Sequence, residues 1–319
     1  MRHVETPFRV IRVERKACQL FTPEGPLTVP TSTAVTVGDW ALVDDTGTVS
    51  SVLPRSTAIR RVTPGGQAVE QVLAANVDVV GVCAPLEPHA RAGRIERLLA
   101  LAWASGAQPL LVATKMDLCE PDEIGPAMEH LGAMAPAVEV IPVTIEQPGS
   151  VDGIRSIIAP DKTLVLLGAS GVGKSSLVNA LIGEESLATT GVRRDGKGRH
   201  TTAWRELVQI PGGGFLIDTP GLRAVGLGED AQEGVDAVFR DVTELAALCH
   251  FKDCGHTGEP GCAVALAIGD GDLDAARLER YRKLQRELEY QDRRFDARAR
   301  AEHTKKWVAM VKQNRKARP

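Results

Sequence analysis

The sequence of 319 residues predicts a multidomain α/β protein. Three observations support this fold class. Short apolar runs separated by turn residues fill the first sixty positions and indicate a small β-barrel. Strand-like and helix-like patterns then alternate from about residue 70 to 220, as in a parallel sheet covered by helices on both faces. Beyond residue 230 the pattern is helical, and three of the six cysteines fall within fourteen residues. We expect domains at 1–62, 63–228 and 229–319.

Composition indicates the cellular compartment of the protein and whether it spans a membrane. Charged residues make up 25% of the chain, and no apolar run reaches the roughly 18 residues that a membrane span needs. Residues 1–16 mix charges throughout and lack the apolar segment of a signal peptide. We therefore expect a cytoplasmic protein with no membrane partner, whose cysteines do not form a disulfide framework.

Charge is unevenly distributed along the chain. Residues 277–319 carry 15 Lys or Arg and 6 Asp or Glu, a surplus of +9, although the whole chain has a net charge of −3. A basic C-terminal arm on an acidic body predicts a polyanionic partner contacted at one end. A solvated helix with surplus basic side chains would explain the composition equally well.

The N-terminal region is expected to form an OB-like β-barrel. Strand-like runs occur at residues 10–13, 27–30 and 40–43, and turn residues separate them. About five short strands in sixty residues suit a small barrel of this kind, and such barrels often bind nucleic acid. A barrel that only packs on its neighbour remains the alternative. The basic residues that favour RNA binding are Arg9, Arg12, Arg15, Lys16, Arg55, Arg60 and Arg61.

In the middle region, apolar periodicity predicts a mostly parallel sheet whose ligands bind at the carboxyl ends of the strands. Gly212 and Gly213 would turn a hairpin between the last two strands. The expected strands are 77–82, 109–113, 138–143, 163–167, 204–210 and 214–218, and the expected helices are 94–105, 122–132 and 176–182. In the C-terminal region we expect helices over 233–248, 263–268 and 273 to about 307, with Asp272 as N-cap of the last.

A phosphate-binding loop follows the strand 163–167. The pattern G-x-x-x-x-G-K-S lets glycines turn several backbone N–H groups toward one anion, while the next helix directs its positive end at the same place. Lys174 would reach the β- and γ-phosphates, and Ser175 would ligate Mg²⁺. The residues of this nucleotide site are Gly168, Ala169, Ser170, Gly171, Val172, Gly173, Lys174, Ser175 and Ser176.

A base-reading motif, Thr114-Lys115-Met116-Asp117, follows the strand 109–113. The Asp117 carboxylate would accept two hydrogen bonds from guanine N1–H and its exocyclic amine. Adenine lacks that amine, and a site of this kind rejects the wrong ligand by roughly 10⁴–10⁵-fold. Lys115 would lie along the base.

A switch-like region completes the nucleotide chemistry. Asp218, in Asp218-Thr219-Pro220-Gly221, would hold the Mg²⁺ shell through water, and the Gly221 N–H would sense the γ-phosphate. Thr201 or Thr202, in a Gly-rich polar stretch, would complete the Mg²⁺ shell when triphosphate is bound. The alternative for this stretch is an ordinary connecting loop.

A candidate metal cluster has the spacing C-x4-C-x-H-x5-C, formed by Cys249, Cys254, His256 and Cys262. Three thiolates and one imidazole form a closed tetrahedral set, which is typical of one structural Zn²⁺. The alternative is a group of free thiols in a short helical domain.

These motifs resemble those of translation-factor-like GTPases, but here the base-reading motif precedes the phosphate loop. That order is similar to the circularly permuted GTPases, and the match is close to the ribosome small-subunit-dependent GTPase A family (RsgA/YjeQ). The resemblance implies an OB-like barrel, a circularly permuted P-loop GTPase domain and a helical zinc-binding domain. It further implies Mg²⁺-dependent hydrolysis of GTP to GDP, stimulated by the small ribosomal subunit, and an rRNA-binding role in late 30S maturation. We expect a monomer.

The chain departs from the family pattern in two places. Thr114 stands where the family usually has Asn, and threonine lacks the amide that touches the base and braces the phosphate loop, which predicts weaker guanine affinity. Thr144 is the counterpart of the base-bracing turn. Leu222 stands where many GTPases place a water-orienting glutamine, and the resemblance nominates His200 as the catalytic group instead.

Two rival functions stay open. The chain could be an RNA-docking factor that uses GTP only as an affinity switch, with negligible turnover. It could also be a P-loop protein that uses ATP, although Asp117 argues against this.

Overall fold

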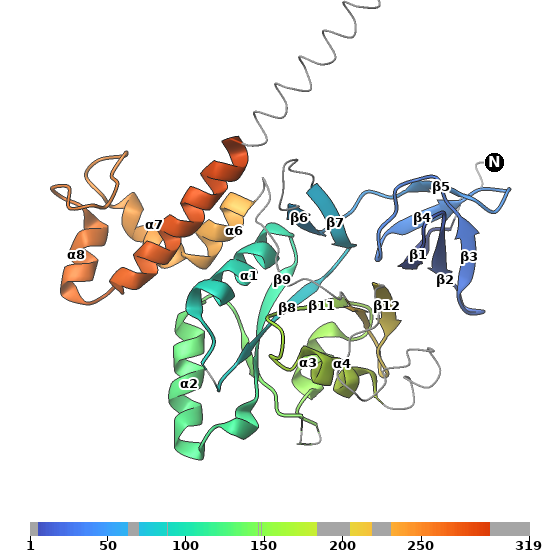
Figure 1. Cartoon of the computed structure of the whole chain (residues 1–319), viewed down its shortest axis with the longest axis horizontal. Coiled ribbons are helices and arrows are strands. Elements are labelled where there is room, and N and C mark those ends of the chain that lie inside the picture. The colour runs from blue at the N-terminus through green and yellow to red at the C-terminus, as the bar shows by residue number, and fades with distance from the viewer. Residues whose placement is uncertain are drawn as a thin grey trace, which may run out of the picture. The chain divides into compact units, whose positions relative to one another are not determined.

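The computed structural model describes residues 6–62, 70–87, 89–145, 147, 149–183, 205–218 and 231–293 (Figure 1). The chain forms two compact units. The first comprises Met1–Arg60 with Val72–Ala224, and the second comprises Arg61–Gln71 with Val225–Pro319. No helix among the described residues is both long and apolar enough to cross a membrane.

The N-terminal part of the first unit, called the barrel below after the predicted OB-like fold, is a five-stranded antiparallel sheet, which confirms that this region is β-rich. Its hydrogen-bonded order is β3-β2-β1-β4-β5. Alternate side chains point inward and form a separate small core of Val10, Cys18, Leu20, Val29, Ala41 and Val49. The strands are β1 (Phe8–Val13), β2 (Ala17–Phe21), β3 (Leu27–Pro30), β4 (Trp40–Val43) and β5 (Val49–Val52). Two further strands, β6 (Ala58–Val62) and β7 (Glu70–Ala75), form a separate two-stranded sheet among the residues that the structure describes.

The rest of the first unit is the predicted α/β sheet, with strand order β10-β9-β8-β11-β13-β12. All neighbours are parallel except the β12–β13 hairpin. The strands are β8 (Val79–Pro85), β9 (Gln108–Thr114), β10 (Val140–Pro142), β11 (Thr163–Leu167), β12 (Glu206–Gln209) and β13 (Phe215–Asp218). Every residue of β11 is buried, as expected for a central strand covered on both faces.

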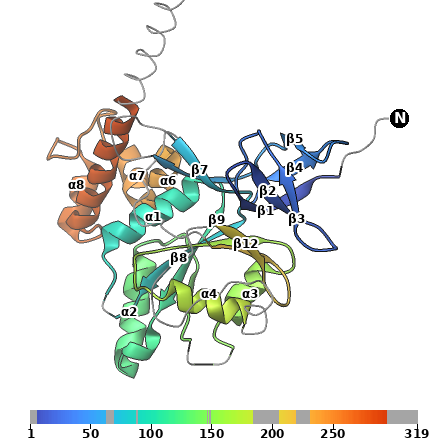
Figure 2. The same cartoon turned by 45° about the vertical axis from the view of Figure 1, so that its right-hand side comes forward.

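Four helices cover the two faces of this sheet. Helices α1 (Ala92–Ala104) and α2 (Pro121–Ala133) lie on one face, and α3 (Asp152–Ile158) and α4 (Lys174–Ile182) lie on the other (Figures 1 and 2). The order in which the chain adds strands reverses between β8 and β11: β9 and β10 lie on one side of β8, and β11 lies on its other side. In such sheets ligands bind beside the carboxyl ends of the strands at this reversal. The fold therefore places a ligand next to the phosphate loop.

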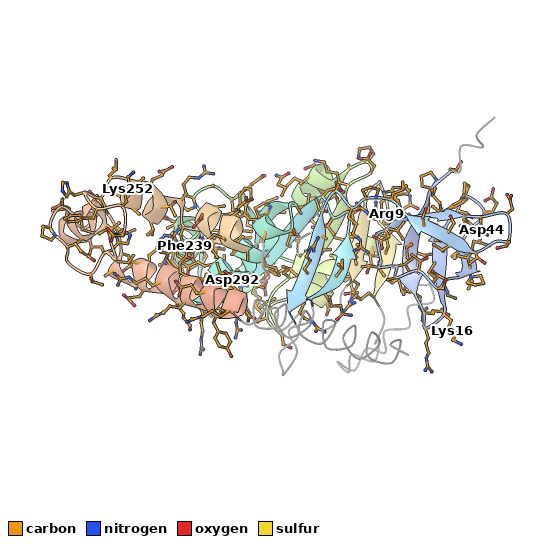
Figure 3. The ribbon with its side chains drawn as sticks, turned by 90° about the horizontal axis from the view of Figure 1, so that it is seen from above. Arg9, Lys16, Asp44, Phe239, Lys252 and Asp292 are labelled. Atoms are coloured by element: carbon orange, nitrogen blue, oxygen red, sulfur yellow. The ribbon has the colours of Figure 1, made fainter. Side chains whose placement is uncertain are left out.

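The barrel is joined to the α/β sheet by hydrogen bonds. Strand β1 pairs with β12, and Arg12 lies opposite Glu206. Asn76 links the two parts, because its Nδ2 donates to the Gly38 carbonyl at 2.9 Å and its Oδ1 accepts from the Ser56 N–H at 2.9 Å. Arg9, which is labelled in Figure 3, donates to the Asn76 carbonyl at 2.8 Å.

The second unit contains α6 (Ala231–Val238), α7 (Arg240–Ala247), α8 (Ala263–Asp270) and a helix over 275–293. The prediction of one helix over 233–248 is wrong, because the backbone turns at Phe239 (φ −102°, ψ 36°), whose ring is fully buried. The prediction of Asp272 as N-cap is also wrong. Asp274 caps the last helix, since its Oδ1 accepts from the Ala276 N–H at 2.9 Å. The predicted continuation of that helix to about residue 307 lies outside the described residues.

Candidate functional site

The phosphate loop lies between the buried strand β11 and helix α4, as the sequence predicts. Gly168 has φ +150°, and a side chain there would place its Cβ 2.8 Å from the Cys83 carbonyl oxygen. Gly173 has φ +99° and directly precedes α4. Only glycine meets both requirements at low cost, so the loop can curl against β8 and direct its N–H groups to one point. The first turn of α4 adds the positive end of its helix dipole at the same place.

Lys174 is held within this loop by the loop's own carbonyl groups. Its Nζ donates to the Gly168 oxygen at 2.8 Å and to the Ala169 oxygen at 2.6 Å. The ammonium is therefore already oriented over the loop rather than extended into solvent. A phosphate that enters the loop competes with two neutral carbonyls, and its greater negative charge favours the exchange.

The base-reading motif lies at the carboxyl end of β9, two strands from β11. Lys115 adopts the left-handed conformation (φ 60°, ψ 35°), and a short 3₁₀ turn, Met116–Leu118, follows it. A lysine in this conformation is uncommon, and such strain often occurs at binding sites. Thr144, buried beyond the end of β10, donates its hydroxyl to Asp117 Oδ1 at 3.3 Å. The structure thus brings together Asp117 and Thr144, which are 27 residues apart in the sequence.

Thr114 joins the two loops. Its buried hydroxyl donates to the Val172 carbonyl in the phosphate loop at 2.6 Å. Although threonine lacks the amide of the family's usual Asn, its hydroxyl still braces the phosphate loop. The weaker guanine affinity expected from Thr114 stays a prediction. The sequence did not predict this bond, because the partner of a threonine hydroxyl depends on how the strands are aligned in the fold.

Asp218 ends β13 and lies opposite Glu206 on β12. Glu206 is half-buried, and desolvation raises its pKa. The negative charge of Asp218 raises this pKa further, and the positive charge of Arg12 opposes both effects. Sequence reasoning did not identify Glu206. Ser175 lies in the first turn of α4. His200, Thr201, Thr202, Gly221 and Leu222 lie outside the described residues.

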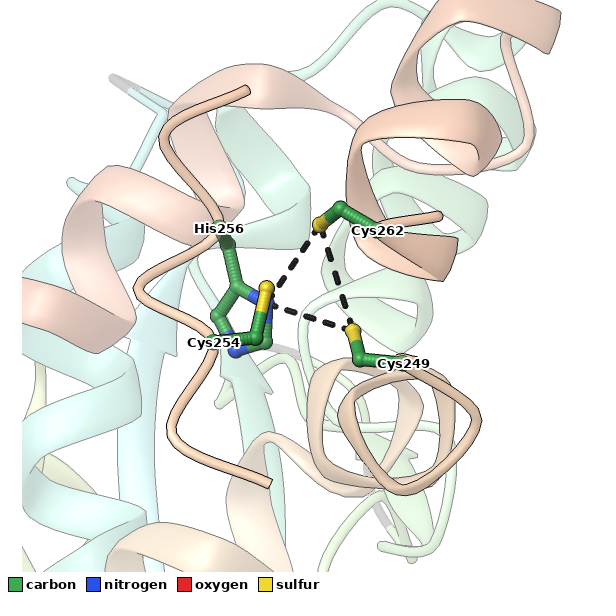
Figure 4. A group of neighbouring side chains, drawn as sticks. All are labelled: Cys249, Cys254, His256 and Cys262. Carbon is green, nitrogen blue, oxygen red and sulfur yellow. Dashed lines mark hydrogen bonds between the residues drawn. The ribbon is translucent and has the colours of Figure 1, made fainter. Parts of the chain in front are cut away.

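Cys249, Cys254, His256 and Cys262 converge in the second unit, as their spacing predicts (Figure 4). Their ligand atoms all lie within 4.8 Å of one another. His256 Nδ1 is 3.5 Å from the Cys249 sulfur and 3.6 Å from the Cys262 sulfur, and these two sulfurs are 3.9 Å apart. A tetrahedral ion with metal–sulfur bonds of about 2.3 Å holds its sulfurs about 3.8 Å apart, so the cluster fits such an ion.

Two surrounding features favour thiolates in this cluster. Cys262 is the N-cap of α8, and its sulfur accepts from the Ala265 N–H at 3.3 Å. For Cys249, desolvation raises the pKa, but hydrogen bonds from the Val264 and Ala263 N–H groups outweigh it and the pKa is lowered. Desolvation instead raises the pKa of Cys254 to about 11. A bound cation would overcome that cost by neutralising the thiolates.

Glu259 organises the loop that carries Cys254 and His256. Its carboxylate accepts from the Gly255 N–H at 3.0 Å, the Thr257 N–H at 2.6 Å and the Thr257 hydroxyl at 3.1 Å. Backbone hydrogen bonds, first from its own N–H, lower the Glu259 pKa to about 2. Arg282 closes the same loop by donating to the Gly255 carbonyl at 2.8 Å. Sequence reasoning missed this role, although an acidic residue inside a Gly-rich ligand loop is a usable signal.

Comparisons with known proteins agree with this architecture. The sequence model of the RsgA GTPase family matches residues 52–228. A protein of Streptomyces coelicolor named small ribosomal subunit biogenesis GTPase RsgA is 47% identical over 94% of this chain and 85% of its own length. A protein of the same name from Streptomyces avermitilis is 45% identical over 94% of this chain and 84% of its own length.

Two solved structures share the fold. The crystal structure of YjeQ from Thermotoga maritima aligns with a TM-score of 0.65 at 23% identity, covering 89% of this chain and 99% of that one. The structure of YloQ, titled a circularly permuted GTPase, also aligns with a TM-score of 0.65 at 23% identity, covering 91% of this chain and 96% of that one. Both alignments support a circularly permuted GTPase fold.

Proposed function

The chain belongs to the RsgA GTPase family, and from this premise we propose that it hydrolyses GTP with Mg²⁺ during cytoplasmic maturation of the small ribosomal subunit. One observation carries the proposal for the site. A single 2.6 Å hydrogen bond, from Thr114 to Val172, joins the base-reading loop to the phosphate loop at the carboxyl edge of one sheet. The relatives named above support the ribosomal setting.

In this proposal the base and the phosphates are held by different loops. Asp117, oriented by Thr144, accepts hydrogen bonds from the Watson–Crick edge of guanine. The loop N–H groups and Lys174 hold the β- and γ-phosphates, and the Gly221 N–H senses the γ-phosphate. Mg²⁺ would be held by Ser175, Asp218 and either Thr201 or Thr202, and it supplies charge neutralisation between the β- and γ-phosphates.

Hydrolysis requires a group that orients the attacking water. Leu222 has no hydrogen-bonding atom in its side chain, so it cannot do this. We assign the role to His200, whose imidazole can accept a hydrogen bond from water and which adjoins the switch threonines. In this proposal, contact with the small subunit brings His200 to its full effect.

The His200 assignment is tested by measuring subunit-stimulated kcat for His200→Ala, with GTP affinity measured separately. General acid–base groups contribute roughly 10²–10⁴-fold, so we expect a fall of that order with unchanged affinity. An unchanged kcat rules the assignment out. A fall in affinity alone would show that His200 shapes the loop instead.

The Cys₃His cluster is proposed to hold one structural Zn²⁺ that fixes the ligand loop between α7 and α8. The fit of the sulfur–sulfur distance to a tetrahedral ion supports this. With all four ligands supplied by the protein, no coordination position remains for a substrate.

Ribosomal RNA is the proposed polyanionic partner, and the basic C-terminal arm is the main source of attraction. The barrel contributes less than its composition suggests, because several of its arginines have partners within the protein. Arg55 pairs with buried Asp39 at 2.7 Å, and Arg9 donates to Asn76 and Thr163. Arg15 and Lys16 are exposed and remain available, and Lys16 projects from the barrel in Figure 3.

The residue Leu222 also supports a second candidate function, in which GTP acts as an affinity switch with negligible turnover. GTP turnover with and without small subunits separates the two. Strong stimulation supports the GTPase cycle, whereas GTP-dependent binding of subunits without stimulation supports the switch. Competition between GTP and ATP for binding tests the base preference that Asp117 predicts.

A further inference from the structure

Three charged side chains lie in a row across three neighbouring strands. Arg12 on β1 is opposite Glu206 on β12, and Glu206 is opposite Asp218 on β13. Residues directly opposite each other in antiparallel strands share one face of the sheet, with Cβ atoms about 5 Å apart. The row therefore runs from the barrel to the end of β13, beside the phosphate-loop strand β11.

The row holds one positive and two negative side chains, which is unusual for a cross-strand ion pair that only stabilises the sheet. Arg12 and Asp218 act on the Glu206 carboxylate with opposite signs, and all three side chains are half-buried. A cross-strand ion pair that served stability alone would need only Arg12 and Glu206. A second carboxylate next to Glu206 adds like-charge repulsion, which a cation bound at Asp218 would reduce further than Arg12 alone does.

We propose that Glu206 is a positioning residue for the Mg²⁺ of the bound nucleotide, and that Arg12 of the barrel moderates its effect. The carboxylate adds negative potential beside Asp218, which strengthens the hold on a divalent cation. The Arg12 guanidinium offsets part of that potential. The barrel thereby influences the nucleotide site through one positive charge. The inference rests on the proposed role of Asp218 in the Mg²⁺ shell.

The sign of each effect follows from Coulomb's law. Removing the charge of Glu206 weakens Mg²⁺ binding, whereas removing the charge of Arg12 strengthens it. For half-buried groups several ångströms from the ion, each change should move the Mg²⁺ midpoint by roughly three- to tenfold. The two charges contribute separately and with opposite signs, so the double variant should lie between the two single variants.

The experiment measures how fast a fluorescent GDP analogue leaves the full-length protein as free Mg²⁺ is varied. We expect the midpoint to rise for Glu206→Gln, to fall for Arg12→Gln and to stay unchanged for Glu129→Gln, an exposed carboxylate on α2. Glu206→Asp and Arg12→Lys keep the charges and should lie near the parent. Nucleotide affinity without Mg²⁺ should be equal in all variants.

The outcomes separate this inference from the proposed function. If the parent shows no Mg²⁺ dependence, the proposed metal site itself fails. If the parent depends on Mg²⁺ but both single variants move the midpoint in one direction, or neither moves it, Glu206 has only a structural role and the inference is overturned. Should Glu206→Gln fail to fold, Glu206→Ala takes its place, with the same expected rise of the Mg²⁺ midpoint.

Discussion

At the scale of single residues, the site depends on short polar side chains that reach across strands. The Thr114 hydroxyl has one proton, and it is donated to the Val172 carbonyl. It therefore braces the phosphate loop but has no proton left for the base. Thr144 orients Asp117 in a similar way. In the proposed function, discrimination of guanine then depends on the Asp117 carboxylate, while Thr114 joins the two loops.

Thr114→Val tests this division. The substitution preserves shape but leaves the buried Val172 carbonyl without its donor, which should destabilise the protein by about 1–3 kcal/mol. GDP affinity should fall with it, because the phosphate loop loses its brace. Thr114→Ser keeps the hydroxyl and serves as the control. Denaturant unfolding and GDP titration provide the readouts, and a valine variant equal to the parent in both would contradict the brace.

At the scale of elements, strands with strong local patterns were predictable and packing-dependent features were not. The strand 163–167 was predicted to the residue, because five consecutive buried aliphatic or small side chains leave little ambiguity. The helix over 233–248 was predicted as one because its periodicity is continuous. It divides because the Phe239 ring packs between Tyr281, with ring centroids 5.5 Å apart, and the Arg277 guanidinium 4.8 Å from its centroid. Those partners lie some forty residues away.

In the candidate site too, features set by the local sequence were predictable and features set by packing were not. The phosphate loop, the base-reading motif and the metal ligands carry their chemistry in residue type and spacing, so they were found from sequence. Glu206 depends on strand register, and Glu259 depends on the path of one loop. Strand register cannot be read from the local sequence, whereas an acidic residue inside the Gly-rich ligand loop was a usable signal for Glu259.

Glu259→Gln tests the ligand loop as an element. The amide keeps the size of the side chain but loses the charge that orders the Gly255 and Thr257 N–H groups. Partners of this kind typically alter metal affinity by about 10–100-fold, and we expect weaker zinc binding near the lower end of that range. Competition with a chromophoric chelator measures it. Glu244→Gln, an exposed change on α7, is the matched control, and equal zinc affinity in both variants would refute the role.

At the scale of the whole molecule, charge is concentrated at the C-terminus while the barrel and sheet share hydrogen bonds. Strand β1 continues the sheet beyond β12, so the barrel and the α/β domain belong to one compact unit. The proposed influence of Arg12 in the barrel on the nucleotide site would therefore act within one unit. The arm contributes attraction over distance, which acts on association more than on fold.

Salt dependence of subunit binding tests the role of the arm. Phosphate contacts release counterions, so the logarithm of the association constant should fall linearly with the logarithm of salt concentration. Deleting residues 294–319 removes nine Lys or Arg and two Asp or Glu, so the slope should become clearly shallower. A slope unchanged by the deletion would show that the arm does not contact phosphate groups, and Arg15 and Lys16 would be examined next.

The strand order also has a consequence for biosynthesis of the protein. The segment with the base-reading loop leaves the ribosomal tunnel about fifty residues ahead of the phosphate loop, and β8 must wait for β11 to cover its second edge. A nascent chain that ends near residue 160 holds three parallel strands with a bare edge and no phosphate loop. GTP therefore cannot help this chain to fold during translation. Until β11 and then β13 emerge, the exposed strand edge can pair with a strand of another chain. Chaperones or rapid translation of the next strands would prevent this.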